Sequence, residues 1–288
     1  MSSDAMAIER KLGSIQNLPT LPLALRQMQK VMKDPRSSMG QIAMVVAKDP
    51  AMASRAIRLV NSAFYGMRER VTSINHAIVI LGLNTLNGIM IGISVIKLFK
   101  NSPIIGFSPE KFWEHCFGTA LLAKSLAEIE ENSDPDQLFI TGLLHDMGRL
   151  LLEQFLHEEF SKSLLLARQG KKPLLECEKE ILHFDHAGAG AWLGRKWGLP
   201  EVIIASMGYH HRKQDLPDDL QGFSEQTRIV SAANRLCNYA AIGSSGETPY
   251  CSSALCPVEN VPEQKIKEIV DKARSEVRLT IEEWNKAL

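Results

Sequence analysis

Apolar residues recur every three or four positions along most of this chain, which is the spacing of amphipathic α-helices. One stripe runs through Met52, Ala56, Leu59 and Val60. A longer stripe near the C-terminus contains Ile266, Ile269, Val270, Ala273, Val277, Ile281 and Trp284. No segment alternates apolar and polar residues with a period of two for long enough to predict a strand. The pattern therefore predicts an all-α protein built as a multi-helix bundle.

Helix start and stop signals support this prediction. Ser38 followed by Gln41 has the form of a capping box. Three dipeptides place a helix-capping residue directly before a proline: Asp49-Pro50, Ser108-Pro109 and Asp134-Pro135. Proline suits the first position of a helix, so each dipeptide indicates a helix start. Gly198 and Pro200 indicate that one helix ends and the next begins within a few residues.

Changes in composition divide the chain into three segments. We expect an N-terminal helical subdomain over residues 12–100, packed on a second helical subdomain over residues 101–240. Residues 241–288 are expected to form an irregular loop and then an amphipathic helix, which packs on the body of the protein or forms a contact in a homodimer. The loop, residues 241–260, is long for a compact domain, so it is an active-site cover, a contact region or a disordered segment.

The charge balance narrows the range of partners. Thirty-three Lys and Arg balance thirty-three Asp and Glu, which removes the simplest argument for binding duplex DNA or a membrane surface. Residues 71–96 are uncharged, but their Asn, Ser, Thr and Gly content favours buried helices over a membrane span. Five cysteines form no disulfide framework, and the N-terminus has no apolar signal region. We therefore expect a cytoplasmic protein with no membrane partner, and we rank nucleic acid low as a partner.

Six residues of the second subdomain belong to types that bind divalent metals. They are His115, His145, Asp146, His186, His210 and His211, in the segments FWEHC, GLLHDMGRL, FDHAGAG and GYHH. Neutral imidazole and carboxylate are ligands of borderline divalent metals, and one carboxylate can bridge two ions. Separate helices can direct such side chains into one bundle core. A single His is more often a core or surface residue, and we assign that role to His76, His157 and His183.

The order of these six residues resembles the HD superfamily of metal-dependent phosphohydrolases, and within it the HD-GYP subgroup, which splits cyclic dinucleotides. The segments NLPTLPLALRQMQKVM, KDPAMASRAIRLVNSAFYG and SINHAIVILGLNTL resemble a narrower group, the HDOD family of bacterial signalling proteins. GLLHDMGRLLL and DHAGAGAWLGRKWGLPEVI match that family as well. The resemblance covers roughly residues 12–240 and implies an N-terminal HDOD subdomain packed on an HD-like helical subdomain.

The resemblance also implies a ligand set for one or two divalent ions of iron, manganese or zinc. The first ion would take His115, His145, Asp146 and Asn234, and the second would share Asp146 and take His186, His210 and His211. The family pattern has Asp at the position of Asn234, whose neutral carbonyl oxygen is a weaker ligand. Arg149 replaces a Lys that follows the HD glycine, and the GYP loop is absent. These departures argue against cleavage of cyclic dinucleotides but leave metal binding open.

Two functions follow from these features. The first is a signal-transduction regulator that acts through contacts with other signalling proteins, because the N-terminal signature is intact and the catalytic set is damaged. The alternative is a metal-dependent phosphohydrolase, in which Asp146 bridges two ions and Arg149 stabilises the charge of a nucleotide or phosphate ligand. Nucleic-acid binding ranks third because no platform of aromatic and basic residues is visible.

Two weaker signals have plainer interpretations. Gly188, Gly190 and Gly194 lack the preceding strand that a nucleotide-binding loop requires, so they indicate close packing of helices. A group of arginines around Asn61 forms either a solvated helix face or a patch that contacts phosphate or a partner. Its members are Arg55, Arg58, Arg68 and Arg70.

Overall fold

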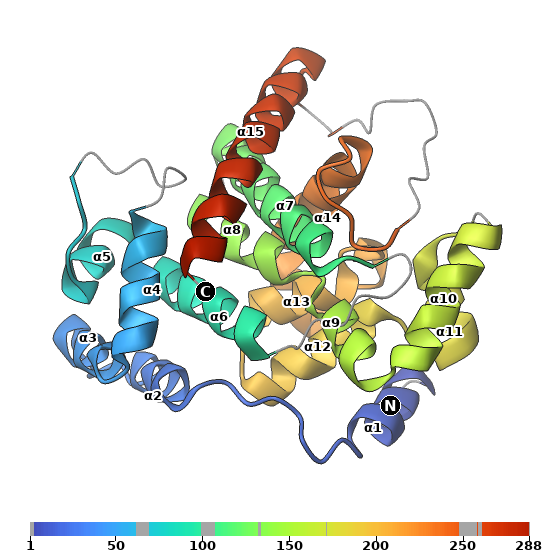
Figure 1. Cartoon of the computed structure of the whole chain (residues 1–288), viewed down its shortest axis with the longest axis horizontal. Coiled ribbons are helices and arrows are strands. Elements are labelled where there is room, and N and C mark those ends of the chain that lie inside the picture. Colours follow the sequence, from blue (N-terminus) through green and yellow to red (C-terminus); the bar gives the residue numbers. More distant parts are fainter. Residues whose placement is uncertain are drawn as a thin grey trace. The chain divides into compact units, whose positions relative to one another are not determined.

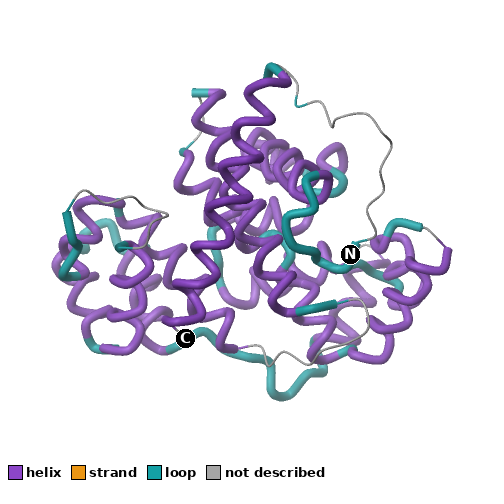
Figure 2. Tube along the Cα trace, turned by 45° about the horizontal axis from the view of Figure 1, so that its top comes forward, coloured by secondary structure: helices purple, strands orange, loops and turns teal. Residues whose placement is uncertain are grey.

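The computed structural model describes residues 3–61, 69–98, 107–131, 134–170, 172–247, 258 and 261–287. In these residues the secondary structure consists of helices and connecting loops, without a strand (Figure 2). The predicted all-α class is confirmed. Arg68 and most of the second half of the predicted loop, residues 248–257, lie outside the described residues.

The helices group into two compact units, which we describe separately. Unit 1 contains Met1–Leu18 and Phe99–Arg274. Its helices are α1 (Ser3–Leu12), α7 (Pro109–Glu130), α8 (Pro135–Leu144), α9 (Met147–Phe155), α10 (His157–Gly170), α11 (Leu174–Leu182), α12 (His186–Trp197), α13 (Glu201–Tyr209), the 3₁₀ helices η1 (Lys213–Asp215) and η2 (Asp218–Phe223), α14 (Ser224–Tyr239) and the first part of α15 (Glu263–Ala287) (Figure 1). Glu9 of α1 belongs to this unit because its carboxylate accepts a hydrogen bond from Trp192 Nε1 of α12 at 2.7 Å.

Unit 2 contains Pro19–Leu98 and Ser275–Leu288. Its helices are α2 (Leu23–Met32), α3 (Met39–Ala47), α4 (Pro50–Val60), α5 (Ile74–Leu81) and α6 (Leu83–Leu98), together with the last part of α15 (Figure 1). Its core includes fully buried side chains from several of these helices, among them Leu25, Val46, Val60 and Leu86.

Helix boundaries lie where the start and stop signals predict them. Ser38 Oγ accepts a hydrogen bond from the Gln41 amide, and the Gln41 side chain accepts one from the Ser38 amide, which completes the capping box of α3. Asp134 caps the first backbone N–H groups of α8. Gly198 ends α12 with a φ of 65°, and α13 begins at Glu201.

The uncharged stretch forms α5 and most of α6 within unit 2. Leu86, Ile89 and Met90 of α6 are fully buried. Among the described residues, no single helix is both long enough and apolar enough to cross a membrane. Segments of α5 and α6 meet that criterion only as a pair that is bent by 120°.

Two glycines bring helices of unit 1 close together around its centre. A Cβ atom at Gly142 of α8 would lie 2.9 Å from the Cα of Ala120 on α7. A Cβ atom at Gly148 of α9 would lie only 1.9 Å from the carbonyl oxygen of His186 on α12. Because these neighbours are backbone atoms, no side chain could move aside, and both contacts require glycine. The segment between α8 and α9 is thereby held between α7 and α12.

The remaining predictions for unit 1 concern α12 and α15. The α12 glycines lie at helix contacts, since a Cβ at Gly190 would meet the Gly148 amide at 3.3 Å and one at Gly194 would meet Ile204 of α13 at 3.1 Å. The amphipathic C-terminal helix is present as α15, with Ile266 buried on its apolar stripe.

Candidate metal centre

Four structural segments of unit 1 carry the six predicted metal-binding residues. His115 lies on α7, His145 and Asp146 connect α8 to α9, His186 begins α12, and His210 and His211 follow α13. The first five are buried, each with at most 1 % of its surface exposed. The side chain of His211 is 19 % exposed, so the cluster meets solvent on that side.

The Asp146 carboxylate lies between two groups of imidazoles. Its Oδ2 is 3.4 Å from Nε2 of His145 and 3.7 Å from Nε2 of His115. Its Oδ1 is 3.3 Å from Nε2 of His186 and 3.4 Å from Nε2 of His210. Each oxygen therefore faces one group, and Asp146 is shared by two sets of potential ligands.

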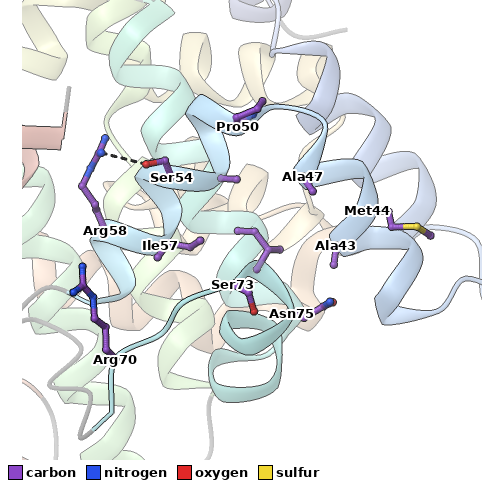
Figure 3. A pocket seen from close by; sticks show the side chains of 12 residues that line it. Ala43, Met44, Ala47, Pro50, Ser54, Ile57, Arg58, Arg70, Ser73 and Asn75 are labelled. Carbon is purple, nitrogen blue, oxygen red and sulfur yellow. Dashed lines mark hydrogen bonds between the residues drawn. The ribbon is translucent and has the colours of Figure 1, made fainter.

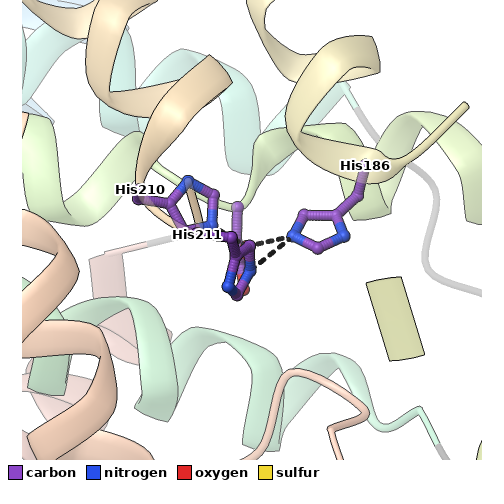
Figure 4. A group of neighbouring side chains, drawn as sticks. His186, His210 and His211 are labelled. Carbon is purple, nitrogen blue, oxygen red and sulfur yellow. Dashed lines mark hydrogen bonds and ion pairs between the residues drawn. The ribbon is translucent and has the colours of Figure 1, made fainter. Parts of the chain in front are cut away.

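His211 completes the second set. Its Nε2 lies 3.0 Å from Nε2 of His186, and the rings of His210 and His211 turn toward His186 from the end of α13 (Figure 4). One potential ligand atom from each of Asp146, His186, His210 and His211 lies within 4.8 Å of all the others. The structure thus brings together all six residues that the sequence singles out.

Hydrogen bonds to Nδ1 orient three of the imidazoles. His145 Nδ1 donates to the Gly142 carbonyl at 2.7 Å, and His210 Nδ1 donates to the Ser206 carbonyl at 2.9 Å. His186 Nδ1 lies 2.6 Å from the buried carboxylate of Glu178. With Nδ1 engaged, Nε2 of each ring is directed at Asp146, which is the arrangement that metal-ligating histidines adopt.

Several buried polar atoms of the cluster have no hydrogen-bond partner among the described residues. They are both ring nitrogens of His115, Nε2 of His145, Nε2 of His210 and both carboxylate oxygens of Asp146. Buried polar atoms in folded proteins are nearly always satisfied. A divalent cation would satisfy one nitrogen of each ring and the carboxylate oxygens, because neutral imidazole nitrogen and carboxylate oxygen are its preferred ligands. The residues present therefore fit a divalent metal ion.

Burial and neighbouring charges set the protonation of the cluster. Burial opposes ionisation of Asp146, but the charges of Arg149 and His145 and the hydrogen bonds from the histidines together outweigh it and hold the pKa of the carboxyl well below its ordinary value. Burial, together with His145, lowers the pKa of His115 to about 3. Burial and Arg149 also act to lower the pKa of His186, but Glu178 and Asp146 outweigh them and raise it to about 9. His115 is therefore a neutral ligand at pH 7, whereas binding of a cation at His186 displaces a proton.

Arg149 lies inside the cluster, completely buried. Its Nε pairs with Asp146 Oδ2 at 3.1 Å, and its Nη1 donates to the Ser245 carbonyl at 2.6 Å. Its Nη2 donates to Glu247 Oε1 at 2.7 Å and lies 3.3 Å from Nε2 of His186. Most of its guanidinium donors are therefore engaged by groups of this chain.

Glu247 is a feature of the centre that the sequence motifs do not reveal. Besides its bond to Arg149, its Oε1 lies 3.5 Å from Nε2 of His211, and its Oε2 accepts from Asn238 at 3.1 Å. It ends the described part of the loop after α14, so residues 241–247 lie against the centre. Glu247 is the only acidic residue of that stretch.

Asn234 is buried on α14, with 2 % of its surface exposed. Its side-chain carbonyl oxygen accepts a hydrogen bond from Asn238 at 3.0 Å. The same Asn238 amide also bonds to Glu247. The oxygen that the family resemblance offers to a metal is thus already engaged in a bond within α14, and Asn238 joins this helix to the loop.

Replacing Glu178 with Gln is expected to weaken metal binding about 10- to 100-fold, because the carboxylate that orients His186 loses its charge. Glu180 on the same helix is the matched control, since it pairs with Lys172 at 3.6 Å and its side chain is 58 % exposed. Isothermal titration of the metal-free protein with Zn²⁺ measures the metal affinity of both variants. Equal affinities for the two variants would show that Glu178 does not position a ligand.

The metal-free protein is expected to be most stable near neutral pH. The pKa of His115 is lowered to about 3 in the folded protein. Between pH 6.5 and 3 the unfolded chain therefore protonates this residue while the folded chain does not, and stability falls as the pH falls through that window. The raised pKa of His186, about 9, makes the folded state bind the additional proton, so stability falls as the pH rises from 6.5 through 9. Urea midpoints from pH 4 to 9.5 test both limbs.

His115→Gln should make the acid limb shallower without removing it, because the pKa values of His210 and His211 are lowered by burial as well, and Glu178→Gln should flatten the alkaline limb. A midpoint that continues to rise between pH 7 and 9 in the metal-free protein would contradict the assignment for His186.

Comparisons with known proteins agree with this architecture. An uncharacterized protein of Treponema pallidum is 24 % identical over 237 residues, which are 82 % of this chain but only 44 % of that protein. An HDOD domain protein of Geobacter sulfurreducens, solved as a protein with unknown function, superposes with a TM-score of 0.78 at 23 % identity and covers 99 % of this chain and 98 % of its own. A Shewanella amazonensis structure, whose name proposes a phosphohydrolase, gives a TM-score of 0.70 at 20 % identity and full coverage of both chains.

These two solved structures share the fold of this chain. The sequence itself also matches the model of the HDOD domain over residues 18–213, more than half of its length. That match includes the N-terminal segments of unit 2 and all four segments that carry the buried cluster. The chain therefore belongs to the HDOD domain family.

Proposed function

We propose that this protein is an HDOD regulatory protein that acts through contacts with other proteins and carries a divalent metal centre as part of its folded core. The observation that carries the proposal is the enclosure of the ligand set. Five of the six residues are buried, and the guanidinium of Arg149, the group best suited to hold a phosphate, already contacts Asp146, Ser245 and Glu247.

The contribution of a metal to such a protein is stability. His115, His145, Asp146, His186, His210 and His211 would hold one ion or two. A bound divalent ion is a Lewis acid, and its binding free energy adds to the stability of the fold. The ligands come from four separate segments of unit 1, so their common contact with an ion would cross-link α7, the α8–α9 junction, α12 and α13.

A metal-dependent phosphohydrolase is the second candidate. The position of Asp146 between two ligand groups favours it, because a bridging carboxylate is what a two-metal hydrolytic site needs. The name of the Shewanella amazonensis structure points the same way. In this case Arg149 could bind a substrate phosphate only after Glu247 released it, so the Arg149–Glu247 bond would control access.

The two candidates predict different results in two assays, one for hydrolysis and one for a protein partner. Metal-loaded protein, wild type and Glu247→Gln, is incubated with cyclic dinucleotides, nucleotides and bis-p-nitrophenyl phosphate, and the full chain is cross-linked in cells. We expect a discrete protein partner and no turnover. Metal-dependent turnover that Asp146→Asn abolishes would contradict the proposal and establish the hydrolase, with Glu247→Gln the faster variant if Glu247 blocks Arg149.

A further inference from the structure

Unit 2 contains an open groove of about 750 Å³ between α3, α4 and the start of α5 (Figure 3). Its floor and sides are mainly apolar, with Ala43, Met44 and Ala47 from α3, Pro50 and Ile57 from α4, and Ile74 from α5. The α3 and α4 residues recur at helical spacing, so each helix presents one continuous face to the groove.

Apolar side chains around the groove are exposed to solvent. Met44, which lines it, is 62 % exposed, and Met39 on the same helix is 61 % exposed. Val79 of α5 is 78 % exposed and lies one turn after Asn75, which also lines the groove. Exposed apolar residues that gather beside a groove indicate a surface for another molecule.

One end of the groove is basic. Arg58 and Arg70 lie at this end, opposite Met44 (Figure 3). Asn61 fixes their spacing, because its side chain makes two hydrogen bonds of 2.7 Å to the backbone of Val71, and so joins the end of α4 to the segment that carries Arg70. Arg58 donates to Ser54 Oγ at 3.2 Å, while Arg70 makes no ion pair with the described residues. None of the described residues that line the groove is acidic.

The basic end belongs to a basic stretch of sequence. Residues 19–98 contain ten Lys and Arg but only three Asp and Glu, although the chain as a whole is neutral. A surplus of seven positive charges over these residues attracts acidic partners and raises their association rate. The complementary occupant therefore has an apolar face and a cluster of negative charge at one end.

We propose that this groove docks an acidic amphipathic helix of a partner protein, with its apolar face against α3 and α4 and its carboxylates at Arg58 and Arg70. The inference rests on the proposed function, because it names the partner surface of a protein that works by contacts. An apolar groove with charged anchors is the usual receptor for such a helix. Nucleic acid fits less well, since none of the groove residues is an aromatic side chain on which a base could stack.

The probe is a fluorescent helical peptide of about 18 residues, or five turns, with Met and Leu on one face and three Glu at one end. Full-length wild-type protein is expected to bind it saturably and with a Kd at least about tenfold lower than that for the Glu→Lys or the scrambled peptide. R58E/R70E should weaken binding by about tenfold or more, while R26E/K30E, an equal charge change on exposed α2 residues outside the groove, should not. Methyl NMR shifts at Met44 and Ile57 locate the site.

The inference is overturned by any of four results. These are no saturable binding, equal binding of the scrambled peptide, equal losses in R58E/R70E and R26E/K30E, or tighter binding of duplex DNA or anionic vesicles through the same arginines. In-cell cross-linking separates this inference from the proposed function. If R58E/R70E still captures the partner, the proposed regulatory function is retained but the groove is not its docking site. If no partner is captured at all, the proposed function itself is contradicted.

Discussion

Replacing Asp146 with Asn is expected to abolish metal binding and to lower the free energy of unfolding by about 3–5 kcal/mol even without metal. Both carboxylate oxygens face histidine Nε2 atoms, and Oδ2 pairs with the buried guanidinium of Arg149. Asn keeps the size of the side chain but removes its charge, so Arg149 loses its fully buried counter-ion. Metal analysis measures the first effect, and urea unfolding in the presence of a chelator measures the second.

Asp136→Asn is the matched control. Asp136 pairs with Lys124 at 2.8 Å, but its side chain is 35 % exposed, so the loss should stay below about 1 kcal/mol. If both variants lost the same stability and Asp146→Asn still bound metal, Asp146 would be neither the buried counter-ion nor the shared ligand.

Replacing Gly148 with Ala is expected to lower the free energy of unfolding by about 3 kcal/mol or more and to weaken metal binding in the fraction that folds. The added Cβ would lie 1.9 Å from the His186 carbonyl oxygen and 2.7 Å from the Gly190 amide. Both are backbone atoms of α12, so α9 and α12 must separate. That separation moves Asp146, which precedes α9, away from His186, which begins α12. Urea unfolding and metal titration measure the two effects.

Gly222→Ala supplies the comparison, because a Cβ at Gly222 would meet no atom within 4 Å. Its stability should stay within about 1 kcal/mol of wild type. Wild-type stability and metal affinity in Gly148→Ala would mean that the α9–α12 contact does not hold the two ligand groups together.

Local signals carried most of the fold prediction. The capping box at Ser38 and the cap at Asp134 act within one helical turn, so neighbouring residues suffice to predict them. The predicted six-residue cluster also corresponds to the residues that meet in space, because their types and order are distinctive. Whether they bind one ion or two depends on distances between helices, which no local pattern contains.

Two acidic residues of the centre could not be predicted, for different reasons. Glu178 lies eight residues before His186, and only the turn between α11 and α12 directs its carboxylate to His186 Nδ1. Glu247 reaches Arg149 from 98 positions away, along a loop with no periodic pattern. The position of Arg149 in the sequence likewise does not reveal that Ser245 and Glu247 accept hydrogen bonds from its guanidinium.

The distribution of charge adds information that the net charge lacks, because a net charge is an average over the chain. Zero net charge disfavours a uniformly basic protein, but it conceals the surplus of seven positive charges over residues 19–98. The arginine patch that the sequence suggests becomes specific only in three dimensions, where the Asn61–Val71 bonds bring Arg58 and Arg70 to one end of the groove.

The metal content of purified full-length protein tests the central claim most directly. The protein is prepared metal-free, reconstituted separately with Fe²⁺, Mn²⁺ and Zn²⁺, dialysed and analysed by plasma mass spectrometry. The account predicts at least one tightly held ion per chain for wild type and none for His145→Ala. The control His157→Ala, at a side chain that is 48 % exposed, should bind as much metal as wild type. Folded wild-type protein that retains none of the three metals, or a His145→Ala variant that retains as much as wild type, would contradict it.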